Sequence, residues 1–579
     1  MPARTGSALP EPQGTAQPSG QLSPVGIESG CPRNGRRGDA ERFKQRELGI
    51  TKLVLPGALL AVACLLPYLN KAYTIDDPCF LLSARQILHD PLQPMSFPIC
   101  WMGDEQCVKS VASLGPGAAQ ALMGYALVPM VLAGGQEWMA HVLQILLACV
   151  AVLEMVRLAL RLGFDRAQAA CAGLMLVAIP PFLSMASTAM PDTLALTLGL
   201  SGIERLLAWK EERRWHQAVV CALTMGLAPY ARPHLALLMP LGALWLFEGF
   251  DVRSAWRQVR REAYAWAPVV GAACLLATVN LITRDRGPAE ESANTLVGYG
   301  HLVPNLLAYF VYLSVPIPLS AVAMIASGRK ALLFAALPAI PLVLAHFMVI
   351  PDEGRQEELP VAAAVYGFAA LVYVLWRLAR GLEQRDCLLG LWVLLPLPAV
   401  FYAHLPIKYM LGVLPAIVLI LIMNLAGLSK RSQFAVYGAV ILGCSVYSCV
   451  LLRADADFAE YGRRAAAELI APHVARGEKV WYGGQWGFYW YAQQAGATIS
   501  IPDGAGPKPG DLLAVGLMEG GDFTRDRFPH RELVASRSYD SPHGRTMGYG
   551  AGLYSNILGY LPWVWAPQAT NTYELWRIR

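Results

Sequence analysis

Apolar and polar residues follow one another along this chain in long blocks. Between residues 51 and 453, apolar stretches of roughly 16 to 24 residues recur, each about long enough to cross a hydrocarbon core of ~30 Å as a helix. Thirteen are counted, centred near residues 60, 147, 176, 198, 223, 240, 273, 316, 340, 370, 394, 418 and 442. The two near 223 and 240 are short, and a single long kinked helix remains an alternative. The pattern predicts an all-α polytopic membrane protein of about 13 transmembrane helices.

Basic residues alternate between the loops that these crossings define. If the N-terminus is cytoplasmic, the inner loops hold eighteen Lys and Arg and the outer loops eight. This bias predicts a cytoplasmic N-terminus and, because the number of crossings is odd, an extracytoplasmic C-terminus. Residues 1–50 are rich in Pro, Gly and Ser and then basic, without an apolar run. They are predicted to be a disordered cytoplasmic tail and not a signal peptide.

The first outer loop, residues 70–137, is unusually long in this register. Its apolar segment Pro116 to Ala133 would destroy the alternation of charge if it crossed, so we expect a helix on the outer membrane surface or packed against the bundle. Cys100 and Cys107 lie in the same loop and would be able to pair if it faces an oxidising compartment.

The composition changes after the last crossing. Residues 454–579 are predicted to form a small extracytoplasmic α/β soluble domain, with a helix over residues 457–476 and short buried strands at 479–482 and 512–515. Its segment Gly548 to Leu553 is not a dinucleotide fingerprint, because no strand and helix flank it properly.

Overall composition excludes several classes of protein. With 55% hydrophobic and 15% charged residues and a mean hydropathy of +0.39, a water-soluble enzyme is excluded. The net charge of +5 gives no support for a nucleic-acid partner, and the 12 cysteines show neither a CxxC nor a metal-ligand spacing.

Two acidic sites on the outer face are candidates for chemistry. Asp76 and Asp77 follow the first crossing, and adjacent carboxylates raise the pKa of at least one of them, which suits a general base. The alternative is a helix cap, with Asp77 before Pro78; capping explains Asp77 well and Asp76 hardly at all. Asp192, at the outer start of a later crossing, is either a second acidic site residue or a cap.

Basic and aromatic residues on the same face would meet lipid phosphates. Arg232 lies between two short helices, and Lys408 and Tyr409 begin another crossing, with His404 one turn earlier. Each cation would make a charge-assisted contact with a phosphate, or else reach towards the headgroups of bulk lipid.

These features resemble the GT-C glycosyltransferases, in particular the protein O-mannosyltransferase and lipid A aminoarabinose transferase branch. Asp76-Asp77 is similar to that branch's Asp-Glu pair, with Asp at the second position. Asp192 matches an acidic residue that begins a later crossing, and Arg232 falls where these enzymes often carry Lys. Residues 408–415 are similar to their Arg-Tyr-x-Leu-Pro-x-x-Pro segment, with Gly412 in place of the first Pro. The similarity covers most of residues 50–450.

Glu105 is a further candidate for substrate binding in the first outer loop. With Lys109 it lies near the position of a Glu-Lys-Pro surface element of the aminoarabinose transferases, without the spacing of that element. That particular activity is therefore not expected.

The resemblance implies a GT-C-like catalytic domain over residues 51–453 in a bacterial inner membrane. It implies an inverting transfer of a sugar from a polyprenyl-phosphate donor to a hydroxyl of a protein, lipid or glycan acceptor. Asp76 would deprotonate the hydroxyl, Arg232 and Lys408 would stabilise the leaving phosphate, and Asp192 would orient the acceptor or sugar. No cofactor and no obligatory metal are expected.

Two other functions remain open at this stage. A transporter or flippase for a lipid-linked or small anionic substrate would place charges at mid-membrane and show an internal repeat, and no repeat is found between the halves. A noncatalytic assembly subunit is the third possibility, because the second acidic residue departs from the family pair.

Overall fold

The computed structural model describes residues 35–101, 106–108, 110–111, 120–247, 263–283, 297–314, 384–501, 506–566 and 569–579, and parts of 360–372. The chain divides into two compact units, Met1–Gly49 and Ile50–Arg579, and the site lies in the second. Helix α1 (Gly35–Leu65) begins inside the segment predicted to be a disordered tail. Residues 35–50 are rich in Arg, Glu, Lys and Gln, which favour helix. The disordered cytoplasmic tail over residues 1–50 stays a prediction.

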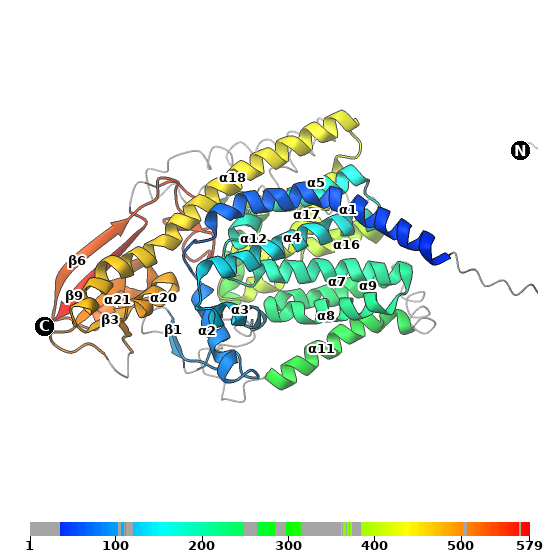
Figure 1. The fold of residues 1–579 in the computed structure, drawn as a ribbon. Helices are drawn as coiled ribbons and strands as arrows, with labels where there is room; N and C mark the ends of the chain where they lie inside the picture. Colours follow the sequence, from blue (N-terminus) through cyan, green and yellow to red (C-terminus); the bar gives the residue numbers. More distant parts are fainter. Residues whose placement is uncertain are drawn as a thin grey trace, which may run out of the picture. The chain divides into compact units, whose positions relative to one another are not determined.

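Five helices in the described ranges are long and apolar enough to cross a membrane. They are Gly49–Tyr68 (α1 with η1), Glu137–Arg161 (α4), Ala263–Thr283 (η4 with α11), Ile407–Asn424 (η9 with α17) and Lys430–Ala475 (α18, η10 and α19). Further helices of the bundle are α5 (Arg166–Ala178), α6 (Phe182–Met185), α7 (Asp192–Glu212), α8 (Trp215–Ala231), η3 (Pro233–Leu237), α9 (Leu238–Leu246), α12 (Leu302–Ser314) and α16 (Gln384–Val393). Figure 1 shows α4, α7, α8 and α11 side by side. The apolar segment centred near residue 340, and most of the one near 370, lie outside the described residues, so the count of 13 stays a prediction.

The segments near 223 and 240 form two separate helices. Arg232 is extended (φ −146°, ψ 116°) between α8 and η3, which breaks the helix at the Arg232-Pro233 bond. At the far end, the Lys210 ammonium of α7 donates to the carbonyl of Trp245 in α9 (2.8 Å). Helix α9 therefore returns to the end of the bundle at which α8 begins, and the alternative of one kinked helix is wrong.

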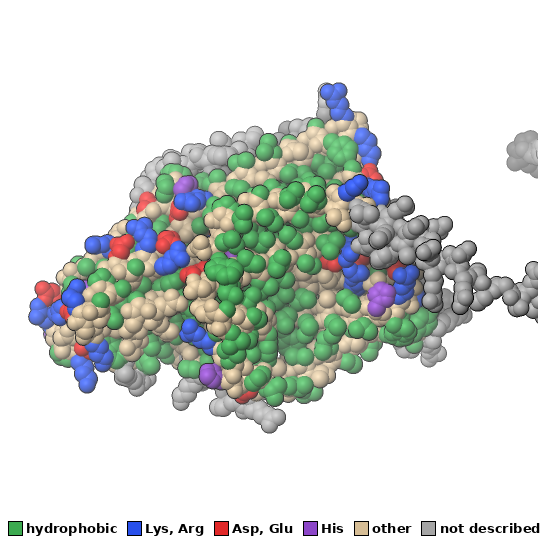
Figure 2. Space-filling model, in the orientation of Figure 1, with side chains coloured by type: hydrophobic (Ala, Val, Ile, Leu, Met, Phe, Trp, Pro, Cys, Tyr) green, Lys and Arg blue, Asp and Glu red, His purple; other side chains and the backbone are tan. Residues whose placement is uncertain are grey.

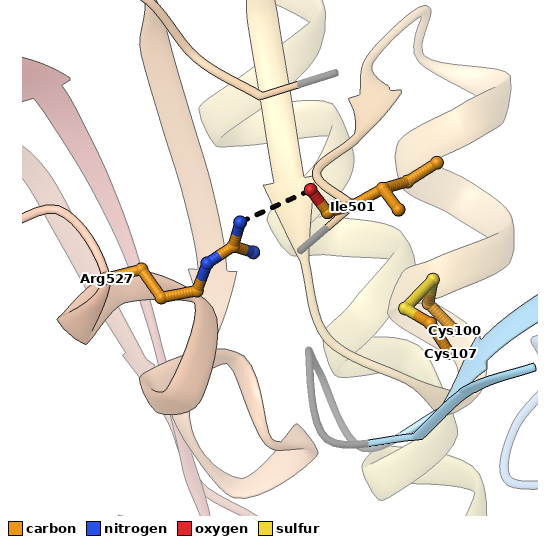
Figure 3. The surroundings of a disulfide bond; sticks show 4 residues. All are labelled: Cys100, Cys107, Ile501 and Arg527. Atoms are coloured by element: carbon orange, nitrogen blue, oxygen red, sulfur yellow. Dashed lines mark hydrogen bonds between the residues drawn. A yellow bond between two sulfur atoms is a disulfide. The ribbon is translucent and has the colours of Figure 1, made fainter. Parts of the chain in front are cut away.

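The long loop predicted over residues 70–137 folds as a helix, a hairpin and a second helix. They are α2 (Asp77–His89), strands β1 (Ile99–Trp101) and β2 (Gln106–Val108), and α3 (Leu122–Leu132). Helix α3 has 11 residues and is about 16 Å long, well short of a bilayer core. It packs on α2, where a Cβ at Gly124 would collide with Ser83. The hairpin carries a disulfide between Cys100 and Cys107, which Figure 3 shows.

The C-terminal part contains a five-stranded sheet in the order β4-β3-β5-β9-β6. Strands β4 (Thr498–Ile499), β3 (Val480–Gly483) and β5 (Leu512–Gly516) are parallel, and β9 (Asn571–Ile578) and β6 (Arg531–Tyr539) continue the sheet antiparallel. Strands β3 and β5 confirm the two predicted strands. Short helices α20 (Trp486–Gln494) and α21 (Gly521–Asp526) accompany them. The predicted domain boundary falls inside α18 (Lys430–Ala465), which runs through residue 454 without a break.

Hydrophobic and charged side chains lie on different parts of the molecule. Figure 2 shows hydrophobic side chains over the helices of the bundle, with Lys and Arg gathered over the C-terminal strands and helices and at the opposite end of the bundle. At one end, Arg161 at the end of α4 binds Glu204 and Glu211 of α7, each at 2.6 Å. The opposite end, where α4 and α7 begin, carries the candidate site.

Candidate active site

The Asp76 carboxylate and the Lys408 ammonium form an ion pair. Asp76 occupies the N-cap position of α2, but its side chain accepts no capping hydrogen bond. Lys408 lies in η9 (Ile407–Val413). Lys408 Nζ donates to Asp76 Oδ2 at 2.6 Å. The Lys408 side chain is 3% exposed and that of Asp76 33% exposed, so the carboxylate is the accessible member of the pair.

Asp192 and Arg232 form a second ion pair beside the first. Asp192 is the first residue of α7, and Arg232 Nε and Nη2 donate to its two oxygens at 2.8 and 2.5 Å. Both side chains are buried. Arg232 also donates to Gln120 Oε1, and its guanidinium lies 5.5 Å from the ring centre of Tyr409. This two-point geometry fixes the plane of the guanidinium, which a lysine at the same position would not do.

The two pairs share one site. Burial raises the pKa of Asp76, but the positive charges of Lys408 and Arg232 outweigh it and hold the pKa below its usual value. Residues from four separate parts of the chain therefore act on one another: Asp76, Asp192, Arg232 and Lys408. Their formal charges cancel.

His404 borders the same site. Its ring lies 5.5 Å from that of Tyr402. Burial and the charge of Lys408 lower its pKa to about 4, although Asp76 acts in the opposite direction. The imidazole is therefore neutral at neutral pH and is able to donate a hydrogen bond, but it brings no positive charge to a phosphate.

Asp77 differs from its neighbour. Its carboxylate accepts hydrogen bonds from the backbone N–H groups of Thr74 (2.9 Å) and Ala189 (2.8 Å), and the residue is 1% exposed. Burial raises its pKa to about 7. Of the two adjacent carboxylates, Asp77 is therefore the one with the raised pKa. Burial is the main cause, and the charge of Asp76 is a smaller one. The catalytic role predicted for Asp77 does not fit a carboxylate whose oxygens both face backbone donors.

A further buried ion pair, between Lys71 and Asp455, was not predicted. Lys71 Nζ donates to Asp455 Oδ2 at 2.5 Å and to Ser187 Oγ at 3.0 Å, and both charged side chains are fully buried. The hydroxyl of Tyr554, from the C-terminal part, donates to the same carboxylate at 2.7 Å. An acidic residue at the end of the last apolar crossing was the available signal.

Two predictions about ligands remain open. Glu105 lies outside the described residues. Within the described ranges, no group of three or more His, Cys, Asp or Glu side chains is placed to hold a metal ion. The expectation that no metal is required stays a prediction.

Comparison with known proteins adds a distant likeness. No family model matches this chain, and no curated protein matches it. Two solved structures of ArnT from Cupriavidus metallidurans are similar over 84% of this chain and 96% of theirs, with 14% sequence identity. The TM-score is 0.47 for ArnT bound to undecaprenyl phosphate and 0.39 for ArnT in the apo state. Similarity at this level carries no conclusion about activity, which rests on the site residues.

Proposed function

We propose that this chain is an integral-membrane glycosyltransferase. It transfers a sugar from a polyprenyl-phosphate donor to an acceptor hydroxyl on the extracytoplasmic side, with inversion at the anomeric carbon. The observation that carries the proposal is the partly exposed Asp76 carboxylate paired with the buried Lys408, next to the Asp192–Arg232 pair. A base and two cations in one site are what this transfer needs.

Two observations support the extracytoplasmic side. The loop that carries Asp76 also carries the Cys100–Cys107 disulfide, and disulfides persist in oxidising compartments. The opposite end of α4 and α7 carries Arg157, Arg161 and Arg205, as cytoplasmic ends of crossings do.

The Asp76–Lys408 contact suggests how donor binding prepares the base. When a lipid phosphate approaches, the Lys408 ammonium leaves the Asp76 carboxylate and binds the phosphate instead. The pKa of Asp76 then rises, because burial still disfavours its charge while the cation that opposed burial is engaged elsewhere. Asp76 thus becomes a stronger base when the donor is in place. It takes the proton of the acceptor hydroxyl as the oxygen attacks the anomeric carbon.

The leaving group is the lipid phosphate, whose charge grows as the glycosidic bond breaks. The Lys408 ammonium stabilises this growing negative charge by direct contact with the phosphate. Arg232 is held by Asp192 and Gln120 in a fixed orientation, so it supplies positive charge without having to reorganise. Asp192 is therefore assigned to hold Arg232, rather than to orient acceptor or sugar as the resemblance implied.

Replacement of Asp76 by Asn tests this assignment. In proteoliposomes supplied with a panel of undecaprenyl-phosphate sugars, we expect Asp76→Asn to lower transfer by about 10²- to 10⁴-fold in a protein that still folds and inserts. Asp90→Asn, at the exposed end of the same helix, is the matched control and keeps full activity. Normal transfer by Asp76→Asn would contradict the proposal. Uptake of a lipid-linked or anionic substrate, unaffected by Asp76→Asn, would favour the transporter.

A further inference from the structure

The loop between the first crossing and α2 is held by a residue more than four hundred positions away in the sequence. The backbone N–H of Tyr73 donates to the hydroxyl of Tyr491 in α20 at 2.9 Å. The same hydroxyl donates to Glu137 Oε1, at the start of α4, at 2.7 Å. One oxygen of the C-terminal part therefore joins the loop that leads to Asp76 and a membrane helix.

Helix α20 lies directly against this loop. A Cβ on Gly487 would come within 2.4 Å of the Tyr73 carbonyl oxygen, so only glycine allows the approach. The Trp490 ring meets the Tyr73 ring edge-on, with 5.9 Å between centres. Tyr73 is fully buried, and its own hydroxyl donates to the carbonyl of Gly135 at 3.2 Å. The contact is thus a packed interface and not a single hydrogen bond.

The backbone between Tyr73 and Asp76 is strained. Ile75 has φ +47°, a left-handed conformation that a β-branched side chain strongly disfavours. Such a conformation persists only where the surrounding contacts fix it. If the anchor at Tyr73 is lost, the loop relaxes by returning Ile75 to negative φ, which moves the next residue, Asp76, away from Lys408.

We propose that Tyr491 is a positioning residue for glycosyl transfer, holding the strained loop so that the Asp76 carboxylate stays on Lys408. The inference rests on the proposed function for the chemistry of Asp76. The inference that residues of α20 hold the loop before Asp76 does not depend on that chemistry, because it follows from the contacts of Tyr73 with Gly487 and Tyr491.

The test compares two tyrosine hydroxyls of the full-length protein. Tyr491→Phe removes the anchor, whereas Tyr539→Phe removes a hydroxyl of the C-terminal sheet that donates to Glu468 at 3.1 Å, away from the loop. In Tyr491→Phe we expect kcat to fall by about 10- to 100-fold, with the KM for the lipid donor changing less than about threefold. Tyr539→Phe keeps the wild-type kcat.

Two further measurements separate positioning from a general loss of stability. Because a displaced Asp76 loses the effect of Lys408 in the free enzyme, the acid limb of the profile of kcat/KM against pH should move up by at least about 0.5 unit in Tyr491→Phe. Hydrogen exchange of the backbone amides of residues 70–77 should accelerate in Tyr491→Phe and not in Tyr539→Phe. If Tyr491→Phe fails to fold, Tyr73→Phe removes the second anchor of the loop and should give the same three changes.

The outcomes are distinct. Unchanged amide exchange, or faster exchange with unchanged kcat and pH profile, would overturn the positioning role. The exchange experiment needs no substrate. An absence of glycosyl transfer in the wild-type protein would therefore contradict the proposed function, while faster exchange would still support the hold on the loop.

Discussion

At the scale of single residues, the neighbours Asp76 and Asp77 have different environments. Asp76 keeps 33% of its side chain exposed and contacts Lys408, whereas Asp77 next to it is enclosed and bound by backbone N–H groups. The sequence singled out the pair, because adjacent carboxylates near a membrane are unusual. The sequence did not show that the Asp77 carboxylate is bound by backbone N–H groups, because one of these donors, Ala189, lies 112 residues away along the chain.

Variants of the Asp192–Arg232 pair distinguish an effect on stability from an effect on activity. Arg232→Met leaves a buried carboxylate without its partner, and we expect the free energy of unfolding to fall by about 3–5 kcal/mol. Adding Asp192→Leu should recover most of this loss, because two apolar residues replace the two buried charges. Glycosyl transfer should stay low in both variants.

Denaturation in detergent and transfer assays on the same preparations check this expectation. Lys430→Met is the control, since Lys430 and Asp165 form an exposed pair whose loss should cost less than about 1 kcal/mol. Full transfer activity of the double variant would show that Arg232 has no part in the reaction.

At the scale of elements, local pattern predicts much of what is observed. The buried runs at 479–482 and 512–515 are strands, and the segment before residue 133 forms the short helix α3 against α2. Elements whose place depends on distant partners were not predictable. The contact of α20 with Tyr73 is an example, because it depends on the close approach that Gly487 permits.

The loop after strand β5 gives a prediction about pH. Glu519 is buried, accepts hydrogen bonds from Asn571 (3.1 Å) and Tyr573, and has its pKa raised to about 8 by burial. Between its usual pKa of about 4.3 and about 8, the folded protein keeps this proton and the unfolded chain releases it. The stabilisation is therefore complete at low pH and is lost as pH rises through this window, by at most about 1.4 kcal/mol per unit.

Glu519→Gln removes this titration while preserving the size of the side chain. Unfolding measured at several values between about pH 5 and pH 8 should show a decline in the wild-type protein that is smaller in Glu519→Gln. Parallel curves for the two proteins would mean that Glu519 does not titrate in this range.

At the scale of the whole molecule, the two ends of the bundle differ in chemistry. One end carries the arginines of α4 and α7 and the other carries the four residues of the site. The alternation of charge along the sequence predicted this polarity. The charge and position of the four residues singled them out, and the resemblance supplied their roles. Neither indicated the buried Lys71–Asp455 pair, whose members lie 384 positions apart and have no shared local pattern.

The disulfide offers a direct test of the orientation. In intact cells, a membrane-impermeant maleimide should label Cys100 and Cys107 after mild reduction and not before, because the pair is oxidised in the outer loop. A variant with both cysteines replaced by serine provides the background. Labelling that needs permeabilised cells would place the loop, and Asp76 with it, on the cytoplasmic side.

The central claim is that Asp76, Asp192, Arg232 and Lys408 form one site for a lipid phosphate. It is tested most directly by a cryo-EM structure of the protein with a bound polyprenyl phosphate. We expect the phosphate within about 3 Å of Lys408 Nζ, near Arg232, with the contact between Asp76 and Lys408 opened. A phosphate bound at the other end of the bundle, or one that leaves the Asp76–Lys408 pair untouched and distant, would contradict the account.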